Sequence, residues 1–155
     1  MSRLWTGSED NPLADRTILI AVQSSWVEPT LTAFREKGGH PLYVTKVDEV
    51  FPILQFEQPE FFILSEGFGS NNSQPNPLLE YIQNMPTNQR RETFVVWVGT
   101  NIKPGEMLSA FSYSVNLVIQ PNQLPEITKQ IIKSWSLWKD LYLVLIQTRL
   151  QIFGH

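Results

Sequence analysis

Ser65 and the glycine-rich segment 67–73 that follows it contain the residue types in this chain best suited to chemistry. A serine hydroxyl becomes a nucleophile only beside a base, and the sequence places no histidine or lysine to serve Ser65. The glycine-rich segment could bind a phosphate through backbone N–H groups, but it lacks the lysine of a P-loop and does not follow the first apolar run. A connecting loop is the favoured interpretation. The possible ligand-binding residues in it are Gly67, Gly69 and Ser70.

The composition excludes several classes of site. The 155 residues include no cysteine, which removes disulfides, iron–sulfur clusters, thiolate zinc sites and thiol nucleophiles. Because only His40 and His155 could supply imidazole, we expect no metal site and no cofactor.

The charge pattern argues against a nucleic-acid partner. The formal net charge is -3, and the longest basic run is Arg90-Arg91, which we expect in an exposed loop. No segment approaches the roughly 18 consecutive apolar residues of a membrane span, and residues 1–12 lack the apolar centre of a signal peptide. We therefore expect no nucleic acid, no membrane association and a cytoplasmic location.

Short apolar runs alternate with helix-length stretches along most of the chain. The strands are predicted at 17–22, 41–45, 61–64, 93–98 and 117–119, and the helices at 26–37, 47–56, from 77, 104–111 and 125–151. Near-continuous apolar strands are typical of a parallel sheet covered on both faces. The sequence predicts a three-layer, flavodoxin-like α/β fold with strand order 2-1-3-4-5, in which a ligand would bind at the carboxyl ends of strands one and three.

The predicted domain is flanked by two segments. Residues 1–15 have no periodic pattern, and their only large apolar side chains are Leu4 and Trp5, so we predict an N-terminal arm without a helix or strand. The domain itself is predicted over 16–133. Residues 134–155 would extend the last helix and form the C-terminal tail.

Several segments resemble one known family. The run 18–25 (ILIAVQSS) resembles the first strand of response-regulator receiver domains, and 59–65 (PEFFILS) resembles their third strand, which ends at the phosphorylated aspartate. Gln120-Pro121 stands where receivers usually carry Lys-Pro, and 124–126 (LPE) opens the last helix as it does in the family. The resemblance implies a receiver-like signalling domain over about residues 16–133, with a cis peptide bond before Pro121.

The resemblance also identifies a phosphorylation pocket that has lost its chemical groups. The magnesium-binding acidic pair falls on Val22 and Gln23, the phosphorylated aspartate on Ser65 and the conserved lysine on Gln120. The hydroxyl residue after the fourth strand has no counterpart closer than Thr100. Magnesium needs carboxylate oxygens, and phosphoryl transfer depends on the metal and on cationic groups. We therefore predict a pseudo-receiver, a receiver-like domain that is not phosphorylated.

Glu66 is the one carboxylate next to this pocket. It could stand permanently where a phosphoryl group would appear and hold an active-like state. Adjacent residues of a strand point to opposite faces, however, so we expect Glu66 in a solvated loop.

The last predicted helix is longer than one domain of this size needs. Over 125–151 it would extend roughly 40 Å, and its apolar residues continue beyond the sheet. We predict a homodimer through this helix, with a further contribution from the fourth helix. The predicted interface residues are Met107, Phe111, Trp135, Trp138, Leu141, Tyr142 and Leu145.

The leading functional hypothesis is a non-catalytic signalling or scaffold domain that works through protein–protein contacts. The alternative is a small-ligand or nucleotide-binding α/β protein whose site lies near Gln23 and Ser65. An enzyme is the third possibility, and it is the least supported because the pocket lacks acid, base and metal-binding groups.

Overall fold

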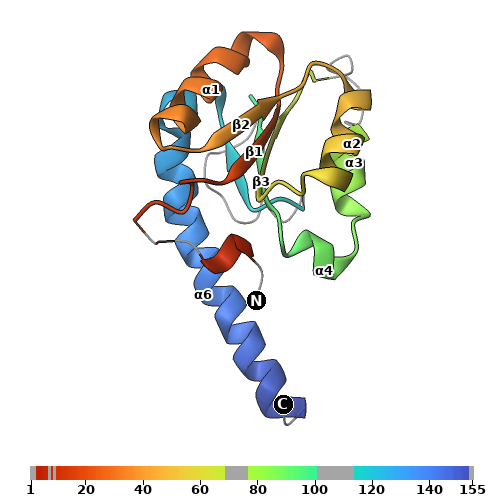
Figure 1. The fold of residues 1–155 in the computed structure, drawn as a ribbon, viewed down its shortest axis with the longest axis vertical. Coiled ribbons are helices and arrows are strands. Elements are labelled where there is room, and N and C mark those ends of the chain that lie inside the picture. Colours follow the sequence, from red (N-terminus) through yellow and green to blue (C-terminus); the bar gives the residue numbers. More distant parts are fainter. Residues whose placement is uncertain (1–2, 7, 9, 69–76, 101–113, 154–155) are drawn as a thin grey trace.

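The structure is a computed structural model that describes residues 3–6, 8, 10–68, 77–100 and 114–153 (Figure 1). Five parallel strands form one sheet in the order β2-β1-β3-β4-β5. They are β1 Thr17–Ala21, β2 His40–Tyr43, β3 Phe61–Ser65, β4 Phe94–Val98 and β5 Leu117–Ile119. The predicted fold class and strand order are confirmed.

Helices cover both faces of the sheet, as Figure 1 shows. Helices α1 (Val27–Glu36) and α6 (Ile127–Phe153) pack on one face, and α2 (Val47–Phe56) and α3 (Pro77–Gln83) pack on the other. This arrangement explains why the strands are apolar on both sides.

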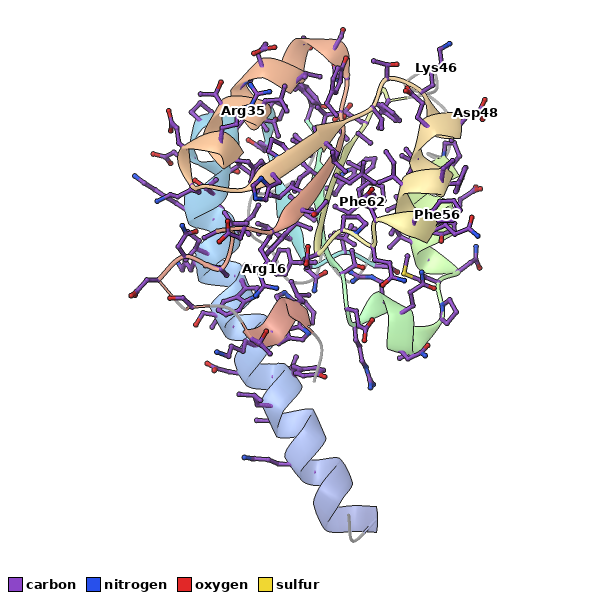
Figure 2. All side chains as sticks on the ribbon, viewed as in Figure 1. Arg16, Arg35, Lys46, Asp48, Phe56 and Phe62 are labelled. Atoms are coloured by element: carbon purple, nitrogen blue, oxygen red, sulfur yellow. The ribbon has the colours of Figure 1, made fainter. Side chains whose placement is uncertain are left out.

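The side chains of β3 show how the two layers share one strand. Phe61 and Ile63 contact the cluster beneath α1 and α6, whereas Phe62 and Leu64 contact the cluster beneath α2 and α3. Figure 2 shows Phe62 on the α2 side. Successive strand residues point to opposite faces, so a strand between two helical layers must be apolar at every position.

Local signals set the ends of α1 and α2. The turn after α1 places Gly38 at a φ of 77°, and the N–H of Gly39 donates to the carbonyl of Phe34 at 3.1 Å, as in a glycine-terminated helix. At the start of α2, Glu49 accepts hydrogen bonds from the N–H groups of Thr45 and Lys46, each at 3.0 Å. Both helices lie where the sequence predicts them.

The structure departs from the sequence predictions around the remaining helices. A short helix, α4 (Thr87–Arg90), was not predicted, and the helix predicted at 104–111 lies outside the described residues. The Gln120–Pro121 bond is trans, so the cis prediction is wrong. Pro121 begins the 3₁₀ helix η3 (Pro121–Glu126), where proline suits the first position, and Gln123 Oε1 accepts the N–H of Gln120 at 3.1 Å.

The N-terminal segment packs against α6 and is not a free arm. Residues Arg3–Thr6 form the 3₁₀ helix η1, which lies beside the middle of α6 in Figure 1. Leu4 and Trp5 are buried in the cluster beneath α1 and α6. The predicted absence of regular structure is therefore wrong for this segment, because the apolar face of α6 supplies its packing partner. None of the described helices is long and apolar enough to span a membrane.

Candidate functional site

The carboxyl ends of the strands meet at one edge of the sheet. The register pairs Ala21 with Leu64, and Val98 with both Ser65 and Ile119. The residues predicted to form the degenerate pocket follow these strand ends. They are Val22 and Gln23 after β1, Ser65 at the end of β3, Thr100 after β4 and Gln120 after β5.

Ser65 joins the ends of β1 and β3. Its side chain is 0% exposed. The hydroxyl oxygen accepts the N–H of Gln23 at 3.0 Å, and the hydroxyl donates to the carbonyl of Glu66 at 2.9 Å. Since both its donor and an acceptor site are used within the fold, Ser65 has a structural role at this edge.

Gln23 and Val22 leave the edge without a negative charge at the end of β1. Val22 is buried in the cluster beneath α1. The Gln23 amide donates to the carbonyl of Glu66 at 3.3 Å and accepts the hydroxyl of Ser25 at 3.1 Å. In the described part of the chain, no group of three or more histidines and carboxylates could hold a metal. A hard cation prefers carboxylate oxygens, which neither Val22 nor Gln23 supplies.

Glu66 connects the end of β3 to the segment after β4. Its carboxylate accepts a hydrogen bond from the N–H of Thr100, and its own N–H donates to the carbonyl of Val98 at 3.1 Å. The residue is partly exposed in the turn after β3, which agrees with the predicted loop position, although the prediction did not include this contact. The strand alternation that motivated the prediction stops at Ser65, and the chain turns at Gly67, where φ is 79°.

Known proteins resemble this chain in structure and not in sequence. No family model and no curated protein matches it. The signal receiver domain of a protein named as a Luxo repressor from Vibrio parahaemolyticus matches with a TM-score of 0.60 at 12% identity, covering 84% of this chain and 97% of that one. The phosphorylated cyanobacterial phytochrome response regulator RcpA matches with a TM-score of 0.58 at 19% identity, covering 79% and 94%. CheY4 of Vibrio cholerae matches with a TM-score of 0.55 at 11% identity, covering 76% and 99%.

The fold is that of receiver domains. These identities are too low to carry function from the solved structures to this chain, because one fold hosts many activities. Within this fold, Ser65 ends β3 and Gln23 follows β1. Of the possible ligand loop, Gly67 lies in the turn after β3, and Gly69 and Ser70 lie outside the described residues.

Trp135 was among the predicted interface residues, and this prediction is wrong. This side chain is 0% exposed, and its Nε1–H donates to the carbonyl of Leu4 at 3.0 Å. Trp135 is therefore a core residue and cannot contribute to an interface. Trp138 and Tyr142 are half-buried on the same side of α6, because the N-terminal segment covers that face.

The other predicted interface residues divide into two groups. Leu141 is 45% exposed and remains available on the surface of α6. Met107 and Phe111 lie outside the described residues, as does the side chain of Leu145.

Two features were missed in the sequence. One is the packing of Trp5, which with Leu4 forms the single pair of adjacent large apolar residues in a segment predicted to be without structure; an aromatic side chain of this size can bury a large apolar area. Arg90 was expected in an exposed loop, but its guanidinium donates to Asn116 Oδ1 at 2.8 Å and to the carbonyl of Thr93 at 2.7 Å. No local pattern in the sequence marks Arg90 as different from its exposed neighbour Arg91.

Proposed function

We propose that this chain is a non-catalytic pseudo-receiver that acts as a signalling or scaffold domain through protein–protein contacts. The observation that carries the proposal is the state of Ser65. It ends β3, where the resemblance implies a phosphorylated aspartate, and its hydroxyl is buried and bound to Gln23 and Glu66. A buried hydroxyl without a base or a metal cannot be activated as a phosphoryl acceptor.

The hydrogen bond of Glu66 favours one arrangement of the carboxyl edge of the sheet that does not depend on phosphorylation. The Glu66 carboxylate already accepts a hydrogen bond from the N–H of Thr100, so this residue after β4 is held without a covalent modification. Charge-assisted hydrogen bonds to a carboxylate are about twice as strong as neutral ones. We infer that Glu66 keeps the domain in one signalling state.

A calorimetric titration with Mg²⁺ tests the loss of metal chemistry. We expect heats equal to those of dilution up to millimolar Mg²⁺, because Val22 and Gln23 bring no carboxylate to the edge. Saturable binding with a sub-millimolar Kd would contradict the proposal.

The alternative of a nucleotide-binding protein is tested by thermal denaturation with ATP and GTP. A ligand that binds only the folded state raises Tm. We expect no shift, because Ser65 and Gln23 bind each other at the edge where a ligand would sit. A concentration-dependent rise in Tm would favour the alternative.

We further propose that the interaction surface lies on α6 from Leu137 onward and makes a homodimer. Leu137, Leu141 and Val144 are 63%, 45% and 55% exposed and follow spacings of four and three residues. Such spacing places them on one helix face, and each would stabilise a dimer by about 1.5–3 kcal/mol if fully buried. Two-fold homodimers are the commonest soluble oligomers.

Sedimentation velocity at micromolar concentration tests this surface. We expect a wild-type dimer and a folded monomer for Leu137→Glu combined with Val144→Glu. The control is Phe56→Glu, which changes a side chain that is 78% exposed on α2 and should leave the dimer intact. A monomeric wild type, or a dimeric double variant, would contradict the proposed surface.

A further inference from the structure

A cavity of about 250 Å³ lies between the N-terminal segment, the end of α4, the residues before β5 and α6. Its lining includes three aromatic side chains, Trp5, Trp138 and Tyr142, together with Leu141. The rings of Trp5 and Tyr142 stack at 5.6 Å with an interplanar angle of 22°, which fixes one corner of the cavity. The cavity lies near the start of β5, whereas the degenerate pocket lies at the carboxyl ends of the strands.

Arg90 brings a positive charge to this apolar cavity. Its guanidinium donates to the carbonyl of Thr93 at 2.7 Å, to Asn116 Oδ1 at 2.8 Å and to the carbonyl of Ser114 at 3.1 and 3.3 Å. All three partners are neutral, and no carboxylate among the described residues forms an ion pair with Arg90. Burial lowers the pKa of Arg90 to about 10, so the side chain remains charged at neutral pH.

The surrounding backbone holds the guanidinium in one position. Ser114 adopts a φ of 59°, a left-handed conformation that is uncommon for residues other than glycine, and its carbonyl faces Arg90. Asn116 Oδ1 also accepts the N–H of Val95 at 2.8 Å, which fixes the side chain that positions Arg90. The four hydrogen bonds use four of the five guanidinium N–H groups, and no described residue accepts the remaining one on Nη1.

Arg91 adds a second positive charge at the cavity. Its side chain is exposed and makes no ion pair with the described residues. Its backbone carbonyl accepts the Nε1–H of Trp5 at 2.9 Å, so the arginine pair and the aromatic wall are fixed to each other.

We propose that this cavity binds a small monocarboxylate carrying one aromatic ring. The ring would contact Trp138 and Tyr142, and the carboxylate would accept the remaining N–H of Arg90 and face Arg91. The cavity is smaller than the ~300–1,000 Å³ of sites for drug-sized ligands, which favours a single ring with a short acidic arm. A carboxylate here would pair with a partly buried cation, an interaction that strengthens away from water. Leu141 lines this cavity and also belongs to the proposed dimer surface, so the two sites adjoin each other on α6.

The probe for the test is 3-phenylpropionate, titrated while the indole N–H resonances of the wild-type protein are recorded by NMR. We expect saturable shifts of the Trp5 and Trp138 resonances. The neutral analogue 3-phenylpropan-1-ol keeps the ring and lacks the charge, and acetate keeps the charge and lacks the ring. Both should bind at least about tenfold more weakly.

Two variants separate the charge from the fold. Arg91→Glu changes an exposed side chain, so the variant should fold normally. Its affinity for 3-phenylpropionate should fall at least about tenfold, while its affinity for the alcohol should stay unchanged. Arg90→Lys keeps a cation but loses the planar array of donors. If its circular dichroism spectrum is native, this variant should also bind 3-phenylpropionate at least about tenfold more weakly. The proposal is overturned by a titration that does not saturate at millimolar concentration, by equal affinity for acid and alcohol, or by an Arg91→Glu variant that binds as the wild type does.

Discussion

Replacing Trp5 with alanine tests whether the N-terminal segment is part of the folded domain. Trp5 is 4% exposed, and its ring stacks on Tyr142 at 5.6 Å and on Trp135 at 6.2 Å. Truncating a buried tryptophan costs about 3–5 kcal/mol, and each aromatic pair contributes about 0.5–1.5 kcal/mol of that loss. We therefore expect Trp5→Ala to lower the free energy of unfolding by about 3–5 kcal/mol, a large share of the roughly 5–15 kcal/mol of a typical domain.

Urea unfolding followed by far-ultraviolet circular dichroism measures this loss, since the variant also removes a tryptophan fluorophore. With a denaturant slope of about 1–3 kcal/mol per molar urea, the midpoint should fall by roughly 2 M. Trp5→Phe keeps an aromatic ring but loses the hydrogen bond to Arg91, so its cost should be intermediate. Phe56→Ala, at a side chain that is 78% exposed, should cost less than about 0.5 kcal/mol. A Trp5→Ala variant within about 1 kcal/mol of the wild type would refute the packing of the segment on α6.

Three further perturbations test other parts of the fold. Ser65→Ala leaves the N–H of Gln23 without its acceptor and should cost about 1–3 kcal/mol in urea unfolding; an unchanged midpoint would contradict that tie. Gly39→Ala would place a Cβ 2.6 Å from Ile18 Cδ1 in the core and should destabilise by about 1–3 kcal/mol, and a neutral result would contradict the close approach. Hydrogen bonds from the residues before α2 lower the pKa of Glu49 below its ordinary 4.5, so this carboxylate stabilises the fold above that pH and loses its effect as the pH falls through the lowered pKa. The difference in urea midpoint between wild type and Glu49→Gln should shrink below about pH 4.5, and a constant difference would contradict the contact.

The sheet and most of its helices could be predicted because their signals are local. In β3, Phe61 to Leu64 are all buried, and the sequence shows them as a continuous apolar run. In α2, the predicted range 47–56 equals the observed one, and its buried residues Val50 and Leu54 lie one helical turn apart. Alternating elements of this kind permit few arrangements other than a parallel sheet between helices.

The remaining features depend on contacts between distant parts of the chain. Trp135 donates to the carbonyl of Leu4 across 131 positions, and Trp5 donates to the carbonyl of Arg91 across 86. No periodic pattern connects such residues, so the sequence alone predicts Trp135 at an interface. Arg90 was missed for the same reason, because its burial depends on Ser114 and on Asn116, which lies 26 positions away.

At Glu66, the alternation of side chains along a strand no longer applies. Strand alternation predicts that residues 65 and 66 face opposite sides, but β3 ends at Ser65 and the chain turns directly afterwards. Beyond a strand end, the direction of a side chain is set by the turn and by its hydrogen-bond partner, which here is the N–H of Thr100.

Intact-mass analysis after incubation with acetyl phosphate and Mg²⁺ tests most directly the proposal that this receiver fold has lost phosphotransfer. The account predicts an unchanged mass for the wild-type protein, because Ser65 is buried and hydrogen-bonded and Val22, Gln23 and Gln120 supply neither a carboxylate nor a cation. The Ser65→Ala variant, treated in parallel, shows whether any added mass depends on that hydroxyl. A gain of one phosphoryl group in the wild type that is absent in Ser65→Ala would contradict the account.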